Sequence, residues 1–110
     1  EGLDGGRINI ATCSIGTAQQ ALEEAAAYVQ ERRQFDSAIA EFQAVQFKLA
    51  DMLTELVAAR QMVRLAARKL DNNDPQASTY CAMAKRFATD AGFNVCNDAL
   101  QLHGGYGYIK

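Results

Sequence analysis

The residues best suited to binding chemistry gather near the carboxyl end of the chain, in Gln101-Leu-His-Gly-Gly-Tyr-Gly-Tyr108. Backbone N–H groups of a glycine-rich segment can approach a phosphate closely, because no Cβ stands in the way. The same residues also fit a plain helix stop, with Gly104 as a left-handed C-cap and His103 as a capping or packing residue. The segment lacks the strand-then-helix context of a Walker or dinucleotide-binding loop. The residues alone therefore predict a candidate phosphate contact.

Two arginines break the patterns around them. Arg32 continues an apolar helical stripe three residues beyond Val29, where a guanidinium needs an anion or a route to water. A cation also suits a helix C-terminus, so snorkelling at the end of a bundle is the alternative explanation. Arg7 lies in a first helical turn, where the dipole disfavours a cation. Either an ion pair with Asp4 or an anionic or adenine-bearing ligand would explain it.

Three apolar stripes at steps of three and four residues indicate the helices that position these groups. The first helix is expected over residues 7–35, the second over the pattern from residue 42 to residue 70, and the third from about residue 75 to residue 103. Asp74 is its predicted N-cap and Pro75 its first residue, while Asp4 with Gly5 and Gly6 marks the start of the first helix. The stripes consist of Ile8, Ala11, Ile15, Ala18, Leu22, Ala25 and Val29, then Phe42, Val45, Leu49, Met52, Leu56, Ala59, Val63, Ala66 and Leu70, then Tyr80, Ala84, Phe87, Ala91, Val95, Ala99 and Leu102.

Helices of matched length with short connections pack as antiparallel neighbours. The predicted fold is an all-α, up-down helical bundle: three long antiparallel helices of a four-helix-bundle domain, with the last helix expected beyond Lys110 or from another subunit. This topology places the end of the first helix, the start of the second and the end of the third at one pole. Each helix should be about 40 Å long. Asp4 and Arg7 are expected at the other pole, beside the turn at residues 72–75.

Composition narrows the function classes. A net charge of -2 on 110 residues gives no electrostatic reason to bind nucleic acid, and no apolar run has the length of a membrane span. One histidine and the absence of CxxC spacing disfavour a metal site. We interpret Cys13, Cys81 and Cys96 as buried reduced thiols, typical of a reducing compartment.

Taken together, five segments resemble the C-terminal helical domain of the acyl-CoA dehydrogenases, and most closely that of the short- and branched-chain members. The resemblance covers essentially the whole chain, in order and with the family's spacing. One departure is Asp36, which stands where the family usually has glycine. The segments are Gly2-Leu-Asp-Gly-Gly-Arg-Ile-Asn-Ile-Ala11, Glu31-Arg-Arg-Gln-Phe35, Phe42-Gln-Ala-Val-Gln-Phe-Lys-Leu-Ala-Asp-Met52, Ala82-Met-Ala-Lys85 and Gln101-Leu-His-Gly-Gly-Tyr-Gly-Tyr108.

The resemblance implies an FAD enzyme that removes an α-proton from an acyl-CoA with a glutamate and passes the β-hydrogen to the flavin as hydride. No residue of this chain would be catalytic, since the family's glutamate is expected in a Glu-Gly-Thr or Glu-Gly-Ser segment beyond Lys110. Arg32 would bind the FAD pyrophosphate of a neighbouring subunit. The implied FAD-binding residues are Arg32, Gln34, Phe35, Gln43, Gln101, Leu102, His103, Gly104 and Gly105, and the implied substrate-binding residues are Asp4, Gly5, Gly6 and Arg7.

The implied partners are an acyl-CoA substrate, an electron-transfer flavoprotein and further copies of the chain, in a homotetramer built as a dimer of dimers. The implied location is the bacterial cytoplasm or the mitochondrial matrix, and the fragment by itself would be inert. Two alternatives stay open: a non-catalytic helical module for self-association, and a relative of the acyl-CoA oxidases or nitroalkane oxidases, which share the scaffold.

Overall fold

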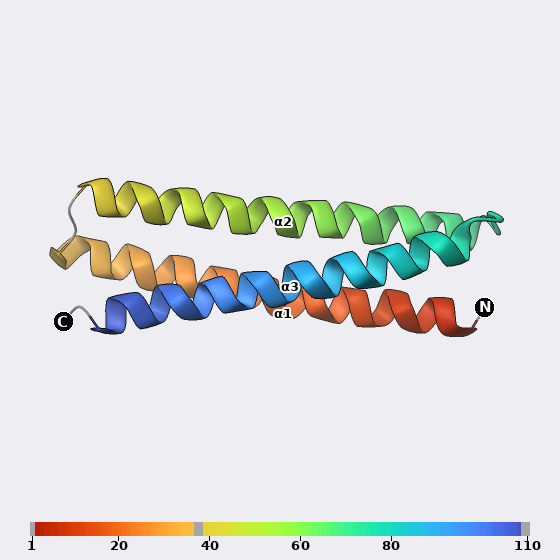
Figure 1. The fold of residues 1–110 in the computed structure, drawn as a ribbon, viewed down its shortest axis with the longest axis horizontal. Helices are drawn as coiled ribbons and strands as arrows, with labels where there is room; N and C mark the ends of the chain where they lie inside the picture. Colours follow the sequence, from red (N-terminus) through yellow and green to blue (C-terminus); the bar gives the residue numbers. More distant parts are fainter. Residues whose placement is uncertain (1, 37–38, 109–110) are drawn as a thin grey trace.

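The computed structural model consists of three long helices laid side by side (Figure 1): α1 (Gly2–Asp36), α2 (Ile39–Asp71) and α3 (Ala77–Tyr108). It describes the backbone of residues 2–36 and 39–108, and the side chains of residues 3–31 and 43–103. Within these ranges the chain has no strand, and the bundle measures 54 × 18 × 15 Å. The prediction of an all-α, up-down bundle is confirmed.

The up-down topology brings the helix ends together at two poles, as expected. In Figure 1 the end of α1, the start of α2 and the end of α3 lie at one pole, while the start of α1 and the turn between α2 and α3 lie at the other. A hydrogen bond from Ser78 to Asp4 joins α3 to α1 at this second pole. A ring contact between Tyr28 and His103 joins the same two helices near the first.

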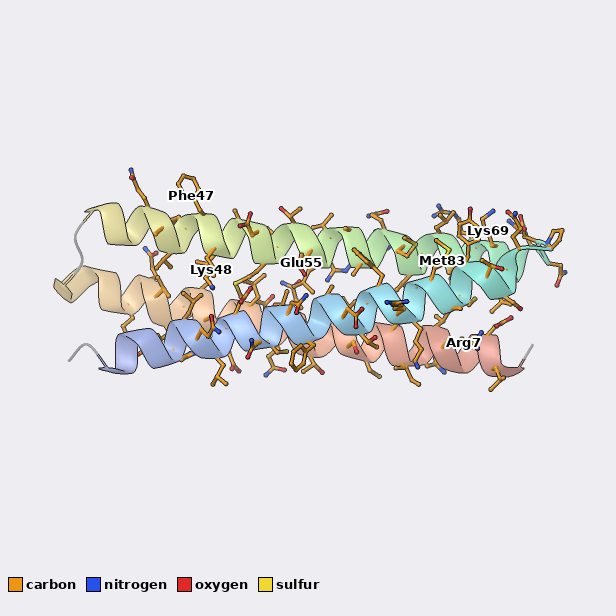
Figure 2. All side chains as sticks on the ribbon, viewed as in Figure 1. Arg7, Phe47, Lys48, Glu55, Lys69 and Met83 are labelled. Atoms are coloured by element: carbon orange, nitrogen blue, oxygen red, sulfur yellow. The ribbon has the colours of Figure 1, made fainter. Side chains whose placement is uncertain are left out.

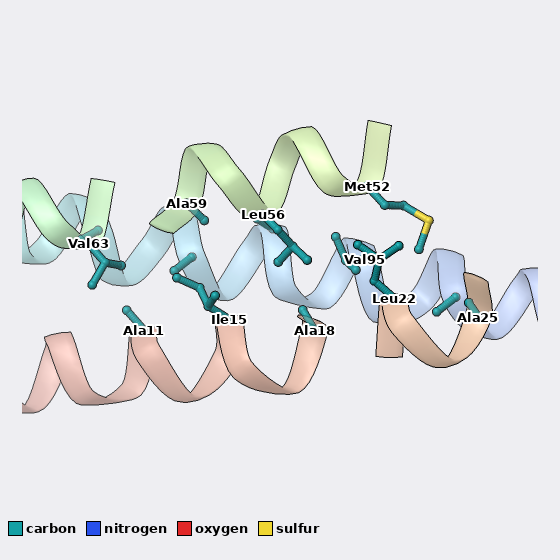
Figure 3. Close-up of a cluster of buried hydrophobic side chains, with 14 of the residues drawn as sticks. Ala11, Ile15, Ala18, Leu22, Ala25, Met52, Leu56, Ala59, Val63 and Val95 are labelled. Carbon is teal, nitrogen blue, oxygen red and sulfur yellow. The ribbon is translucent and has the colours of Figure 1, made fainter. Parts of the chain in front are cut away.

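The core is a narrow seam in which alanines alternate with a few larger side chains. Small side chains let helix axes approach closely, and Figure 3 shows Leu22, Met52, Leu56 and Val95 filling the space between them. The predicted stripes of α1 and α2 are confirmed over the described side chains, with Ile8, Val45, Leu49 and Leu70 partly buried against the core. The side chain of Phe42 lies outside the described residues. The buried residues of the core cluster are Ala11, Ile15, Ala18, Leu22, Ala25, Val29, Met52, Leu56, Ala59, Val63, Ala66, Cys81, Ala84, Ala88, Ala91, Val95, Ala99 and Leu102.

The predicted stripe of α3 was wrong at one position. Phe87 was expected to face inward but is 39% exposed, and the neighbouring Ala88 is fully buried in its place. Cys81 also lies in the core, one residue past the predicted Tyr80. The inward face of α3 follows its small residues Ala84, Ala88 and Ala91.

The two helix boundaries that were predicted at glycines, the start of α1 and the end of α3, were wrong. α1 begins at Gly2, five residues before the predicted start at Arg7, so Gly5 and Gly6 are helical. α3 continues to Tyr108 and does not end at His103, so Gly104 is no left-handed cap. A glycine inside a helix costs about 1 kcal/mol relative to alanine, which weakens a long helix without ending it.

The turn between α2 and α3 has the hydrogen bonds of a Schellman motif. Asn73 N–H donates to Leu70 O at 3.2 Å, and Asp74 N–H donates to Lys69 O at 2.9 Å. Asn73 has the left-handed backbone that this motif requires, with φ of 54°, and asparagine is among the few non-glycine residues that adopt it readily. The local sequence therefore ends α2 with an αL asparagine where glycine is more usual.

Asp74 then caps the start of α3, as predicted, but α3 begins at Ala77 and not at the predicted Pro75. Its Oδ1 accepts a hydrogen bond from Gln76 N–H at 2.7 Å, and its carbonyl accepts one from Ala77 N–H at 3.0 Å. The Gln76 N–H bond is the largest cause of a lowered pKa for the Asp74 carboxyl. Desolvation opposes it in part, and Lys69, whose Nζ lies 3.3 Å from Oδ2, lowers the pKa further.

This cap predicts a pH-dependent stability. Because the folded-state pKa of Asp74 lies below its ordinary value of 3.8, the carboxylate stabilises the fold above that value and loses this effect as the pH falls through the folded pKa. We expect the difference in melting temperature between wild type and Asp74→Ala to be largest near about pH 7 and to narrow by about pH 2. A difference that stays constant over this range of thermal scans would contradict the charged cap.

Candidate functional site

The predicted nucleotide contacts meet at the pole formed by the end of α1, the start of α2 and the end of α3. We call this the glutamine pole and define it by the described residues Tyr28, Lys48, Asp98, Gln101 and His103. Gln43 is also exposed on the first turns of α2. The structure therefore brings the described part of the predicted FAD set to one end of the bundle.

Lys48 connects α2 to α3 at the glutamine pole. Its ammonium Nζ lies 3.5 Å from Gln101 Oε1, to which it donates, and 3.6 Å from Asp98 Oδ1. The Lys48 and Asp98 side chains are about one-third exposed, with values of 37% and 32%, and Gln101 is exposed. One cation thus contacts both polar groups on this face of α3.

His103 is held by its own helix and by α1. Its Nδ1 lies 3.0 Å from Ala99 O, a geometry in which the protonated Nδ1 donates to the carbonyl. Its ring centroid lies 4.6 Å from that of Tyr28, with the rings tilted by 40°. Leu102 beside it is 7% exposed and packs in the core, so any contact it makes with a ligand would come from its backbone. His103 is oriented and half-buried, whereas Gln101 faces solvent.

Five further predicted FAD residues lie near the ends of α1 and α3. The α1 backbone carries Arg32, Gln34 and Phe35, and the α3 backbone carries Gly104 and Gly105, to the glutamine pole. The side chains of the first three and the surroundings of the two glycines lie outside the described residues. For these five, helix position agrees with the prediction.

Asp4 and Arg7 form a separate cluster at the opposite pole. Asp4 is 3% exposed and accepts a hydrogen bond from Ser78 Oγ at 2.6 Å, while Arg7 Nη1 lies 3.6 Å from Asp4 Oδ1. The ion pair that sequence analysis offered as one explanation of Arg7 is therefore present. A Cβ added at Gly5 or Gly6 would meet nothing within 4 Å, so the backbone there is open to an approaching molecule.

The two poles are far apart. Asp4 and Tyr28 lie on the same helix 24 positions apart, which corresponds to about 36 Å at the rise of an α-helix. Figure 2 shows Arg7 and Lys48 toward opposite ends of the bundle. No single small ligand spans this distance, so one ligand cannot contact both clusters.

A shallow groove of about 530 Å³ runs between α1 and α3, lined in part by Ile10, Cys13, Phe93 and Cys96. Ile10 is 51% exposed and Phe93 is 70% exposed. Cys13 is exposed as well, which corrects the expectation that all three cysteines are buried; Cys81 alone is fully so, and burial raises the pKa of its thiol. The three helices thus leave an open, largely apolar groove between α1 and α3.

Sequence analysis missed Lys48, Asp98 and Tyr28. Asp98 and Gln101 are three residues apart, which places them on one helical face, and the antiparallel topology puts the start of α2 beside that face. That combination was a usable signal for Lys48. Among the described residues there is no cluster of acidic, histidine or cysteine side chains that could hold a metal ion, and no helix long and apolar enough to cross a membrane.

The donors at the glutamine pole suit the phosphates of a dinucleotide. An exposed amide and a lysine ammonium both donate hydrogen bonds, and phosphate oxygens only accept them. The one carboxylate in the described cluster, on Asp98, is paired with Lys48. This donor set can contact a phosphate-bearing ligand that approaches from outside the bundle.

Known proteins similar to this chain share its sequence and its shape. The mitochondrial isobutyryl-CoA dehydrogenase of Dictyostelium discoideum is 56% identical over 108 residues, which cover 98% of this chain and 26% of that protein. The structure of butyryl-CoA dehydrogenase from Megasphaera elsdenii is 43% identical, with a TM-score of 0.84 over 96% of this chain and 27% of that one.

A second structure, from work on the electron transferring flavoprotein of Acidaminococcus fermentans and flavin-based electron bifurcation, contains a chain that is 47% identical, with a TM-score of 0.83 over 96% of this chain and 28% of that one. The sequence thus spans about a quarter of the length of its relatives. A family description of the acyl-CoA dehydrogenase C-terminal domain matches residues 1–110. The chain belongs to the acyl-CoA dehydrogenase family and corresponds to its C-terminal domain.

Proposed function

We propose that this chain is the FAD- and subunit-contacting bundle of an acyl-CoA dehydrogenase that acts on short or branched-chain acyl-CoA thioesters. The observation that carries the proposal is the convergence of Lys48, Gln101 and His103 at one pole, in a chain 56% identical to an isobutyryl-CoA dehydrogenase. Bound FAD would supply the hydride acceptor. The catalytic base is proposed to lie outside these 110 residues.

The residues of this chain would bind and orient the FAD and the acyl-CoA substrate. At the glutamine pole the Gln101 amide would donate to the FAD phosphates, together with Gln43, Arg32 and the backbone of residues 102–105. At the opposite pole the Arg7 guanidinium, with the open backbone at Gly5 and Gly6, would contact the nucleotide end of the CoA ester. Asp4 would hold Arg7 in place by their ion pair.

The separation of the poles supports a shared cofactor. Because about 36 Å divides the two clusters, one bundle would hold the acyl-CoA of one active site and the FAD of another. This arrangement requires association of subunits, and a homotetramer built as a dimer of dimers satisfies it. We further propose electron transfer to an electron-transfer flavoprotein, in view of the related chain in the Acidaminococcus fermentans structure. The proposed location is the mitochondrial matrix or the bacterial cytoplasm.

The test is anaerobic titration of the full-length, FAD-loaded protein with isobutyryl-CoA and butyryl-CoA. Loss of flavin absorbance at 450 nm, with formation of the enoyl-CoA, is the expected result. Repeating the reaction in air separates a dehydrogenase from an oxidase, because rapid hydrogen peroxide formation would favour the oxidase alternative. Failure of both thioesters to reduce the flavin would refute the proposed substrate class.

One observation favours a second candidate function, self-association without catalysis. The groove between α1 and α3 exposes Ile10 and Phe93, and exposed apolar surface of this kind often marks a protein interface. Sedimentation of Ile10→Ser/Phe93→Ser in the full-length protein measures its contribution. If assembly were the whole function, the protein would carry no flavin, and Gln101→Ala would change nothing.

A further inference from the structure

We infer that Lys48 is a positioning residue that fixes which end of the Gln101 amide faces a bound flavin nucleotide. The inference rests on the proposed function, in which Gln101 contacts the FAD phosphates. It starts from a contact across two helices, in which Lys48 Nζ on α2 lies 3.5 Å from Gln101 Oε1 on α3.

The chemistry of the two groups sets the direction. A lysine ammonium has three donors and no acceptor, so it can hydrogen bond only to the oxygen of a glutamine amide. With Oε1 turned toward Lys48, the Nε2 end and its two hydrogens point the other way. An unheld glutamine can present either end, and its oxygen would repel a phosphate. Lys48 thereby selects the rotamer that donates.

Asp98 keeps Lys48 in this position. Its Oδ1 lies 3.6 Å from the same ammonium, and it precedes Gln101 by three residues on the same face of α3. A lysine side chain has a long flexible stem that loses rotamer entropy when it is fixed. The carboxylate offsets part of this loss before any nucleotide arrives, so the three side chains form one preorganised unit.

Lys48 also carries a positive charge, and attraction of the phosphates by that charge alone is the competing explanation. The two explanations predict opposite effects of Asp98→Asn on FAD binding. Removing the Asp98 carboxylate makes the pole more positive, so attraction by charge alone predicts tighter FAD binding for Asp98→Asn. Positioning predicts weaker binding, because Lys48 loses its second contact.

The experiment measures the dissociation constant of FAD for the full-length apoprotein by flavin fluorescence, with melting temperatures recorded to verify folding. Lys48→Met removes the donors and retains the stem, and should weaken binding about tenfold, as expected for a charged hydrogen bond of about 1.4 kcal/mol. Lys48→Arg keeps a charged donor and should retain most of the wild-type affinity for FAD. Asp98→Asn preserves the size of the side chain and should weaken FAD binding severalfold.

A double-mutant cycle isolates the positioning effect. In the Gln101→Ala background, Lys48→Met should have almost no further effect on FAD binding, because there is no amide left to orient. Equal losses in both backgrounds, or tighter binding by Asp98→Asn, would overturn the inference. If Gln101→Ala weakens FAD binding and Lys48→Met does not, the inference fails and the proposed function stands. If Gln101→Ala itself leaves FAD binding unchanged, the proposed FAD contact fails as well.

Discussion

Leu56→Ala is expected to lower the free energy of unfolding by about 3 kcal/mol, the typical loss for a leucine truncated in a close-packed core. Leu56 is 0% exposed and lies midway along α2, where it faces both other helices (Figure 3). Alanines make up much of the seam around it, and they have no rotamers with which to fill the vacated space. The cavity should therefore persist, and denaturant unfolding followed by circular dichroism measures the loss.

Leu53 provides the matched control for this truncation. It lies one turn before Leu56 on the same helix but is 47% exposed, so Leu53→Ala removes the same atoms from a site that water already reaches. We expect Leu53→Ala to lower the free energy of unfolding by less than about 1 kcal/mol. Equal losses for the two variants would mean that the inward face of α2 is misassigned.

Gly92→Leu is expected to destabilise the bundle by about 2 kcal/mol or more, because α1 passes directly over Gly92. A Cβ at this position would lie 3.1 Å from the backbone oxygen of Ser14 and 3.3 Å from its Cβ. Backbone cannot move aside as a flexible side chain can, so α1 and α3 must separate along part of the seam. The bundle then loses the contacts between alanines of α1 and α3 on both sides of the crossing.

Gly16 tests whether this effect is steric. It is also a helical glycine, in α1, but a Cβ added there would meet nothing within 4 Å. Gly16→Leu should therefore stabilise the helix by about 0.5–1 kcal/mol through propensity alone. The two thermal melts should shift in opposite directions, and destabilisation of similar size at both positions would contradict the close crossing at Gly92.

Sequence periodicity predicted the three helices and the topology because long amphipathic helices with short connections leave little choice of arrangement. It failed at Phe87, since hydrophobicity alone ranks phenylalanine above Ala88 for burial. The face of α3 that packs against the other two helices decides that position, and it is a property of the assembled bundle. It failed again at Gly5, Gly6 and Gly104, where local glycine signals were taken as helix ends although the helices continue through them.

The candidate site was predictable in part. Up-down-up topology was enough to bring Gln101 and His103 to one pole and Arg7 and Asp4 to the other. The link from Lys48 to Gln101 was not predicted, because it depends on the register between α2 and α3 and not on either helix alone. Arg32, Gln34 and Phe35 remain predictions, since their side chains lie outside the described residues.

The most direct test of these site assignments is whether the glutamine pole binds FAD and the opposite pole binds the acyl-CoA substrate. In the full-length protein, FAD affinity and the Michaelis constant for isobutyryl-CoA are measured for Gln101→Ala and Arg7→Ala. We predict that Gln101→Ala weakens FAD binding about tenfold and that Arg7→Ala raises the Michaelis constant severalfold while FAD binding stays unchanged. The reverse pattern, or a loss of FAD affinity in both variants alike, would contradict the assignment of the poles.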